Sequence, residues 1–291
     1  MPIKLMFCTN RPDVAAIAEE AGVDRIWVDM EYLGKAQRQG GMDTLQSRHT
    51  PADVAAVRQV IRRAEVVVRV NPMHEGQPGL PSTAEEVDAV IAAGADLVML
   101  PYFRTAAEVR RFVDMVGGRA RVFPLLETPE AVEVLDDILS IPGIDEMHIG
   151  INDLSLGYGK RFLFELLTDG TVERLCLRLR ESGLPYGFGG FGGLSRGAVP
   201  AERLIAEHYR LGSTRAILSR SFCKVEEISD RETIRRTFRE GIPAIRAYEN
   251  KACEALRKGD TAFFRESRQA MEKEVAAVVA EKEKKERGGS V

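Results

Sequence analysis

The sequence alternates between short apolar runs and longer amphipathic segments, and this alternation recurs eight times. Each short run has the length and the apolar or β-branched content of a buried strand, and the segments between the runs have helical apolar spacing. The order predicts strand–helix units on a parallel sheet. The eight predicted strands are Lys4–Cys8, Arg25–Met30, Val66–Val70, Leu97–Pro101, Arg121–Leu126, Glu146–Ile149, Tyr186–Gly189 and Ala216–Ser219.

The helical segments carry start and stop signals. Thr50, either Ser82 or Thr83, and Thr128 each precede a segment whose first turn a hydroxyl can cap. Gly22 and Gly94 stand where a helix ends in a left-handed residue. The predicted helices include Pro12–Ala21, Ala52–Arg63, Ala84–Ala93, Ala106–Val116 and Pro129–Leu139.

Eight such units fit an α/β fold of the (β/α)8 TIM-barrel type, which typically needs about 250 residues. The alternative is an open doubly wound sheet, but that fold usually carries a glycine-rich turn after its first strand. Here that turn reads TNRP at residues 9–12, so the barrel is favoured. We predict a TIM barrel over residues 1–224 and a C-terminal helical extension over residues 225–291.

The extension is charged, with predicted helices at Arg231–Glu249 and Asp260–Lys284. It could be a solvated cap on the barrel or an arm that packs on a neighbouring subunit. Apolar residues within it favour the second interpretation, so we expect a homo-oligomer formed through these helices. Those apolar residues are Ile242, Ile245, Phe263 and Phe264.

Composition excludes several classes of partner. The chain has 41 Lys and Arg against 44 Asp and Glu, a net charge of −3, so nothing electrostatic favours nucleic acid or an anionic membrane. Four scattered cysteines without metal-like spacing indicate a reducing compartment. No signal-peptide pattern and no apolar stretch of spanning length occur. We therefore expect a cytoplasmic protein with neither nucleic acid nor membrane as partner.

Charged residues stand at the ends of several predicted strands, where a TIM barrel has its active site. Asp29 and Glu31 end the second strand, Arg69 the third, and Glu127 the fifth, while Asp153 follows the sixth.

Clustered carboxylates lose hydration, and a divalent cation compensates them best. Oxygen ligands favour Mg²⁺ or Mn²⁺, with Co²⁺ or Zn²⁺ as surrogates. An adjacent arginine suits a substrate carboxylate. The pattern predicts a site that binds a 2-oxo acid and stabilises its enolate.

The same residues have a purely structural interpretation. Glu127 and Asp153 could stabilise helix N-termini, each by a few tenths to about 1 kcal/mol. Arg69 could serve only as their ion-pair partner. Joint placement at the ends of three strands favours the functional interpretation.

Two strings carry a resemblance to a known family. PLLET at 124–128 and HIGINDLSLGYG at 148–159 resemble the metal-binding motifs of the HpcH/HpaI aldolase and citrate-lyase-like family. The resemblance extends over roughly residues 4–224. Its most specific part is a Glu followed 26 positions later by an Asp in a Gly-x-x-Asp-Leu context. It implies a TIM-barrel lyase or aldolase, dependent on a divalent metal, that breaks a carbon–carbon bond in a 2-oxo acid or an acyl-CoA.

The resemblance also implies roles for individual residues. Glu127 and Asp153 would be the metal ligands, and Arg69 would hold the carboxylate or carbonyl of a small-molecule substrate. Backbone amides from Gly150 to Asp153, Asn152 among them, would seat the substrate carboxylate. Asp29 and Glu31 match the acidic cluster that the family has after its second strand.

The chain departs from the aldolase pattern at Tyr32, where members usually have a histidine that acts with a water as acid and base. Another group must then move the proton. The loop from Tyr32 to Thr50 is long, which is typical of an active-site lid. We expect His49, Lys35 or Tyr32 to supply the group, with His49 placed in the catalytic set and Tyr32 among the substrate contacts. The loop also carries Arg38, Gln39 and Asp43.

Two other functions stay open. The same metal site could cleave an acyl-CoA or a phosphorylated substrate, for which Arg104, Arg196 or Lys160 could form an anion-binding rim. A barrel that keeps the site without catalysis is the non-enzymatic alternative, and the missing histidine supports it. The glycine-rich stretch at 186–193 lacks a P-loop ending and indicates close backbone approach instead. Cys8 has no evident activating partner, which favours a small buried residue over a nucleophile.

Overall fold

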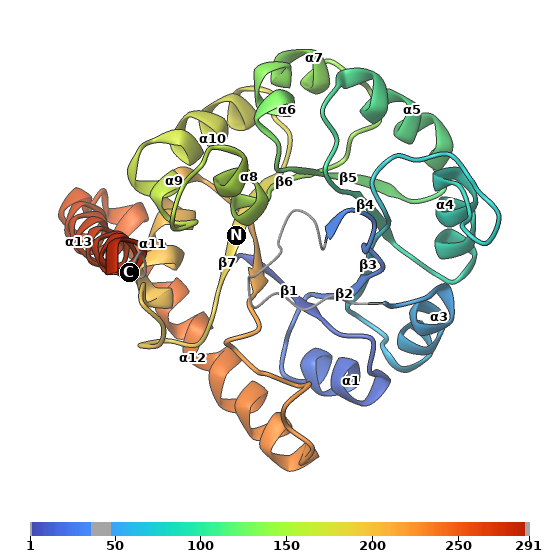
Figure 1. The fold of residues 1–291 in the computed structure, drawn as a ribbon. Coiled ribbons are helices and arrows are strands. Elements are labelled where there is room, and N and C mark those ends of the chain that lie inside the picture. The colour runs from blue at the N-terminus through green and yellow to red at the C-terminus, as the bar shows by residue number, and fades with distance from the viewer. Residues whose placement is uncertain (1, 36–47, 289–291) are drawn as a thin grey trace.

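Eight parallel strands form a closed barrel, and helices surround it (Figure 1). The computed structural model describes residues 2–35 and 48–288. Each strand pairs with the next along the chain, and the last strand pairs with the first. The strands are β1 (Lys4–Cys8), β2 (Arg25–Asp29), β3 (Glu65–Arg69), β4 (Leu97–Leu100), β5 (Arg121–Leu126), β6 (Met147–Ile149), β7 (Tyr186–Phe191) and β8 (Arg215–Leu218).

The helices follow the strands in the order that the sequence predicts. Their bounds are α1 (Pro12–Glu20), α3 (Pro51–Val60), α4 (Thr83–Ala92), α5 (Ala106–Val116), α6 (Pro129–Glu133), α7 (Leu135–Leu139), α8 (Ile151–Gly157), α9 (Glu165–Thr168), α10 (Thr171–Glu181), α11 (Ala201–Leu211), α12 (Arg231–Lys258) and α13 (Thr261–Gly288). The predicted TIM barrel is therefore confirmed. Among these helices and the rest of residues 2–35 and 48–288, no segment is long and apolar enough to cross a membrane.

The predicted helix caps form, whereas one predicted helix is wrong. The hydroxyls of Thr50, Ser82 and Thr128 each accept a hydrogen bond from the backbone N–H three residues later. The segment predicted as one helix, Pro129–Leu139, is broken into α6 and α7. The break lies at Val134, whose φ of −103° and ψ of 22° depart from helical geometry.

Apolar side chains form two layers because successive strand residues point to opposite faces. On β3, Val66 and Val68 face the surrounding helices, whereas Val67 faces the barrel interior. The interior layer is a packed core rather than a pore. Its buried members are Met6, Trp27, Val67, Leu97, Met99, Phe123 and Leu125.

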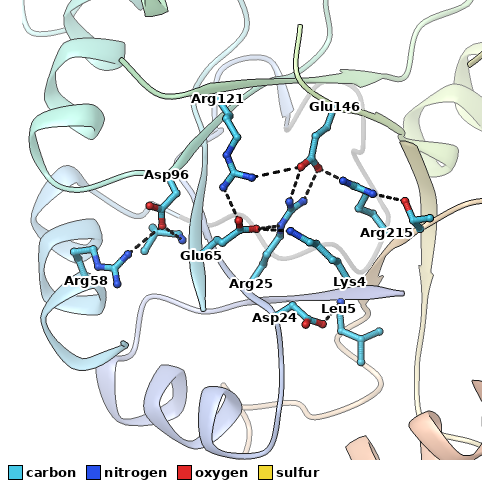
Figure 2. Close-up of polar contacts among 12 residues, drawn as sticks. Lys4, Leu5, Asp24, Arg25, Arg58, Glu65, Asp96, Arg121, Glu146 and Arg215 are labelled. Carbon is cyan, nitrogen blue, oxygen red and sulfur yellow. Dashed lines mark hydrogen bonds and ion pairs between the residues drawn. The ribbon is translucent and has the colours of Figure 1, made fainter. Parts of the chain in front are cut away.

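An ion-pair cluster fills the N-terminal end of the barrel (Figure 2). Arg25, which is 0% exposed, donates from both terminal nitrogens to the two Glu146 oxygens at 2.8 and 2.7 Å. Its Nε donates to Glu65 at 2.7 Å. Arg215 reaches Glu146 at 2.7 Å, and Arg121 reaches Glu65 at 2.6 Å. These residues start their strands or directly precede them, so the cluster closes the end of the barrel that active sites do not use.

Glycines in β7 allow this strand to lie unusually close to β8. A Cβ atom at Gly187 would collide with the Arg215 carbonyl oxygen, and one at Gly190 with the Ile217 carbonyl oxygen. The register between the two strands shifts between these glycines. The close backbone approach in this stretch is to the neighbouring strand, and an approach to a ligand stays a prediction.

The C-terminal extension packs on the barrel of its own chain. Helix α12 contacts α1 and α11, and α13 contacts α11 and α9; α13 lies beside α11 in Figure 1. Ile242, Ile245 and Phe264 are buried by these contacts, and Phe263 is half-buried. The apolar residues that suggested a subunit contact are thus largely covered within the chain. The homo-oligomer stays a prediction without their support.

Candidate active site

A cavity of about 540 Å³ opens where the strands end. The last residue of a strand, or one just after it, lines the cavity at seven of the eight strands. These lining residues are Cys8, Asp29, Arg69, Glu127, Gly150, Phe191 and Leu218. This is the end of a TIM barrel that carries the chemistry in enzymes of this fold.

Two carboxylates that the sequence predicted as metal ligands, Glu127 and Asp153, line this cavity. They are only 2% and 7% exposed. Burial, together with the charges of Asp153 and Glu31, raises the pKa of Glu127 well above its ordinary value. A cation between the two carboxylates would relieve this repulsion. Among the described residues no group of three or more Asp, Glu, His and Cys is placed to hold a metal, and the role of Glu127 and Asp153 as metal ligands stays a prediction.

The backbone fixes the Glu127 carboxylate from two sides. The N–H of Tyr102 donates to Glu127 Oε1 at 3.0 Å. Tyr102 has a φ of 49°, a left-handed conformation that is rare outside glycine and often marks a functional site. On the other side, a Cβ atom at Gly150 would lie 2.6 Å from Glu127 Oε2. The sequence did not predict a role for Tyr102, because its conformation leaves no mark in the residue pattern.

The start of helix α8 forms another part of the cavity wall. Gly150, Asn152 and Asp153 line the cavity, and Gly150 immediately precedes the helix. Amides in a first helical turn lack acceptors within the helix, so they suit an anionic group. The predicted role of Gly150 and Asn152 in seating a substrate carboxylate stays a prediction, and their place in the wall is compatible with it.

Arg69 forms the centre of a second charged group in the wall. Its Nε and one Nη donate to the two oxygens of Asp29, both at 2.8 Å, and its other Nη lies 3.1 Å from Glu31 Oε2. The guanidinium also lies over the Trp27 ring, 4.7 Å from its centre. Burial lowers the pKa of Arg69, but the two carboxylates outweigh it and hold the pKa above its ordinary value. Arg69 is therefore a permanent, rigidly held cation.

Lys35 adds a second cation to this group. Its Nζ lies 3.0 Å from Asp29 Oδ2 and 3.8 Å from Glu31 Oε2, and the residue is 5% exposed. Burial raises the pKa of Asp29, but Arg69 and Lys35 outweigh it, so the pKa lies below its ordinary value. Two buried cations thus balance two buried carboxylates. Unlike Glu31, Lys35 is part of the cavity wall.

Other residues predicted around the second strand lie outside that wall. His49 Nδ1 accepts a hydrogen bond from the Asp29 N–H at 3.0 Å, so in the neutral ring the proton is on Nε2. Burial lowers the pKa of His49 and favours that neutral form. Tyr32 is 41% exposed. Neither His49 nor Tyr32 lines the cavity. Arg38, Gln39 and Asp43 lie outside the described residues.

Asn71 fixes the start of the loop after β2, a role that the sequence did not predict. Its side-chain oxygen accepts from the backbone N–H groups of Tyr32 and Leu33, both at 3.0 Å. Its amide nitrogen donates to Glu86 at 2.7 Å. The only signal for this role in the sequence is that Asn71 is a polar residue just after an apolar strand. Asn71 is fully buried, so it holds this loop against the third strand.

Of the three residues considered for an anion-binding rim, Arg196 lines the cavity. Arg104 and Lys160 do not, and they pair with Glu130 at 3.7 Å and Asp169 at 2.8 Å.

Two reactive side chains in the wall are held inert. Burial and the charge of Asp29 raise the pKa of the Cys8 thiol to about 12. Burial lowers the pKa of His148 to about 4, and its Nε2 bonds to the Gly189 carbonyl at 3.0 Å. A protonated thiol is a poor nucleophile, and a neutral imidazole bonded to the backbone is a structural group. Both observations agree with the structural interpretation of these residues.

Comparisons with known proteins agree with the fold. The sequence model of the HpcH/HpaI aldolase/citrate lyase family matches residues 4–161, more than half of the chain. Two solved structures are similar in fold. An HpcH/HpaI aldolase from Desulfitobacterium hafniense DCB-2 has 17% identity and a TM-score of 0.55, covering 75% of this chain and 86% of its own. A protein of the HpcH/HpaI aldolase/citrate lyase family from Burkholderia cenocepacia J2315 has 15% identity and a TM-score of 0.58, and the match covers 81% of this chain and 94% of that protein. A search of curated proteins gave no match. The chain belongs to the HpcH/HpaI aldolase/citrate lyase family.

Proposed function

We propose that the protein is a divalent-metal-dependent carbon–carbon lyase that cleaves a hydroxylated 2-oxo acid into pyruvate or a close relative and an aldehyde. The observation that carries the proposal is the buried carboxylate pair, Glu127 and Asp153, in a cavity whose wall also holds the buried cation Arg69. Membership in a family of aldolases and lyases supports it.

The donor set fits a hard divalent cation. Members of the family generally use a divalent metal, and two carboxylates with open positions suit Mg²⁺ or Mn²⁺ better than a thiolate-seeking metal. Glu127 and Asp153 would hold the ion. When bound, it polarises the oxygens of a 2-oxo acid and stabilises the negative charge that develops when the carbon–carbon bond breaks.

Arg69 is suited to hold the substrate carboxylate or oxo oxygen. Two of its five N–H groups donate hydrogen bonds to Asp29, and its other Nη forms an ion pair with Glu31 at 3.1 Å. These contacts do not use every N–H group of the guanidinium. The carboxylates fix the guanidinium before the substrate arrives. A donor held in this way stabilises developing charge without reorganising during the reaction.

Cleavage also requires a proton carrier. The hydroxyl proton must be taken up as the bond between C3 and C4 breaks, and C3 of the resulting enolate must then receive a proton. We assign the second transfer to Lys35, whose ammonium lies in the cavity wall, 3.0 Å from Asp29. Lys35 donates a proton to C3, and its neutral amine then recovers the proton that the hydroxyl has released to water. His49, predicted for the same task, uses Nδ1 to accept from the Asp29 N–H and does not line the cavity.

Substitution of Lys35 tests this assignment. Lys35→Met should lower kcat at least a hundredfold, the ordinary contribution of a positioned acid or base, while metal affinity measured by calorimetry stays unchanged. His49→Gln is the comparison, because an amide oxygen can also accept the Asp29 N–H. If Lys35→Met keeps its kcat and His49→Gln loses it, the proton carrier is His49.

Glu127→Gln tests the proposal as a whole, because it removes the charge and keeps the shape. We expect no Mn²⁺ binding by calorimetry and no cleavage of a panel of 4-hydroxy-2-oxo acids that the wild type cleaves. Glu133→Gln, an exposed residue on α6, is the matched control and should behave as the wild type. Retention of full metal affinity in Glu127→Gln would remove Glu127 from the metal site.

A further inference from the structure

The cavity has an apolar side as well as a charged one. Three of the residues on the apolar side belong to the loop between α8 and α9, and the other three lie at the end of β7, before α11 and on α11. These residues are Phe162, Leu163, Phe164, Phe191, Val199 and Leu204. We refer to them as the apolar wall. The wall faces the same cavity as Glu127 and Arg69, so one ligand can reach both sides.

The apolar wall is built before any ligand arrives. Phe191, Val199 and Leu204 are 1%, 5% and 3% exposed. The Phe162 and Phe164 rings meet edge to face with centres 5.2 Å apart, and both are half-buried. Aromatic pairs in this arrangement hold each other in place. The loop therefore presents a fixed apolar surface.

The C-terminal extension holds this loop from outside. Lys282 on α13 donates from Nζ to the Arg161 carbonyl at 2.7 Å, and the same Nζ lies 5.7 Å from the centre of the Phe162 ring. Arg161 pairs with Glu283 at 3.4 Å and with Glu286 at 3.1 Å. Helix α13 thus contacts the backbone directly before the apolar wall. Both α13 and the whole apolar wall lie beyond residues 4–161, which the family model matches.

We propose that the apolar wall receives the carbon chain of the aldehyde, and that this chain is aliphatic or aromatic rather than hydroxylated or anionic; the proposal rests on the lyase function proposed above. In cleavage, the bond between C3 and C4 breaks, its electrons stay on the pyruvate part, and the C4 hydroxyl becomes the aldehyde after losing its proton. The group attached to C4 then faces the wall. Hydroxyls placed there would lose hydration without compensation.

The main competing ligand is an aldehyde that carries a phosphate group, because Arg196 could bind that group. Its side chain is exposed and lines the same cavity, as do Ser219 and Ser221. An aldehyde with a phosphate group would use these groups instead of the apolar wall. The experiment therefore needs a phosphorylated aldehyde beside the apolar ones.

The test measures kcat/KM for condensation of pyruvate with propanal, hexanal, glyceraldehyde and glyceraldehyde 3-phosphate, with Mg²⁺ and Mn²⁺. Each buried methylene contributes about fourfold, so hexanal, with three more methylenes, should exceed propanal by about sixtyfold. Hexanal should also exceed both glyceraldehydes. Equal values for hexanal and propanal, or a preference for either glyceraldehyde, would overturn the proposal.

Variants distinguish a specific effect of the apolar wall on aldehyde preference from a general loss of structure. Leu163→Ser should reduce the ratio of hexanal to propanal at least fivefold, and Lys282→Ala should reduce it in the same direction by loosening the loop. Lys285→Ala is the control on α13, because Lys285 pairs with Glu281 on the surface of the same helix, and it should keep the wild-type ratio. An unchanged ratio in Leu163→Ser counts against the wall.

Deuterium exchange into the methyl group of pyruvate, without an aldehyde, distinguishes the two proposals. Exchange accompanied by no preference for hexanal overturns the apolar wall and leaves the lyase function standing. Absence of exchange and of condensation with every aldehyde overturns both.

Discussion

Replacement of Arg25 by methionine tests the account of how the barrel is closed at its N-terminal end. The change removes a fully buried guanidinium that donates three hydrogen bonds, two to Glu146 and one to Glu65. Methionine fills much of the same volume. The loss of stability therefore reports on the charge and its hydrogen bonds more than on a cavity.

The magnitude follows from the pKa of Glu146. Burial raises that pKa, but Arg25 and Arg215 outweigh it and lower it from 4.5 to about 2. The lowering corresponds to about 3 kcal/mol of stability at pH 7. Because the pKa is lowered in the folded state, this stability is fully present above pH 4.5 and is lost as the pH falls towards 2. Arg25 provides two of the three shortest bonds to Glu146 and one to Glu65, so Arg25→Met should cost about 3 kcal/mol at pH 7.

Urea unfolding at pH 7 and pH 3, followed by circular dichroism, measures this cost. The difference between wild type and variant should shrink by about half at pH 3, because Glu146 is then protonated in the unfolded chain but still mostly ionised in the folded wild type, so folding must release a proton. Arg111→Met is the control. Its partner Glu75 lies 2.7 Å away in an exposed pair, which is expected to contribute less than about 1 kcal/mol. Equal losses in Arg25→Met and Arg111→Met, or a loss that does not change with pH, would refute the reasoning.

Two further predictions concern the cavity. Arg69→Lys keeps the positive charge, but an ammonium cannot form the bidentate contact with Asp29 and also reach Glu31. The kcat/KM for a 2-oxo acid, measured by steady-state kinetics, should therefore fall at least tenfold. The metal affinity, measured by calorimetry, should stay unchanged. Gly150→Ala places a Cβ atom 2.6 Å from Glu127 Oε2, so Mn²⁺ affinity should fall about tenfold; an unchanged affinity would show that Glu127 does not need this cradle.

The fold could be predicted from the sequence because its signals are local. A buried strand such as Val66–Val70 is a run of β-branched residues, and a cap such as Thr50 acts on an N–H three residues away. The ends of the strands also indicate which charged residues share the barrel mouth, and Arg69, Glu127 and Asp153 do line one cavity there.

What the sequence could not predict depends on contacts between distant segments. Tyr102 acts on Glu127 through a left-handed backbone, and Asn71 acts on Tyr32 from the neighbouring strand. Both effects use backbone groups, which every residue carries. The choice between Lys35 and His49 likewise depends on which side chain reaches the cavity, and spacing within a loop does not determine that.

The break at Val134, and the choice between the barrel and a neighbouring subunit as the surface covered by the C-terminal extension, could not be predicted for a related reason. The apolar spacing of Pro129–Leu139 continues through the break, so periodicity alone predicts one helix. Similarly, apolar residues such as Ile245 look the same in the sequence whether they are covered by their own chain or by another subunit. Only the structure shows that the chain covers them itself.

The most direct test of the central claim is deuterium exchange into the methyl group of pyruvate, followed by proton NMR. The account predicts exchange by the wild type with Mg²⁺, Mn²⁺ or Co²⁺, no exchange after the metal is removed with a chelator, and none in Glu127→Gln. Wild-type protein that exchanges no methyl proton with any of these metals would contradict it, as would Glu127→Gln exchanging at the wild-type rate.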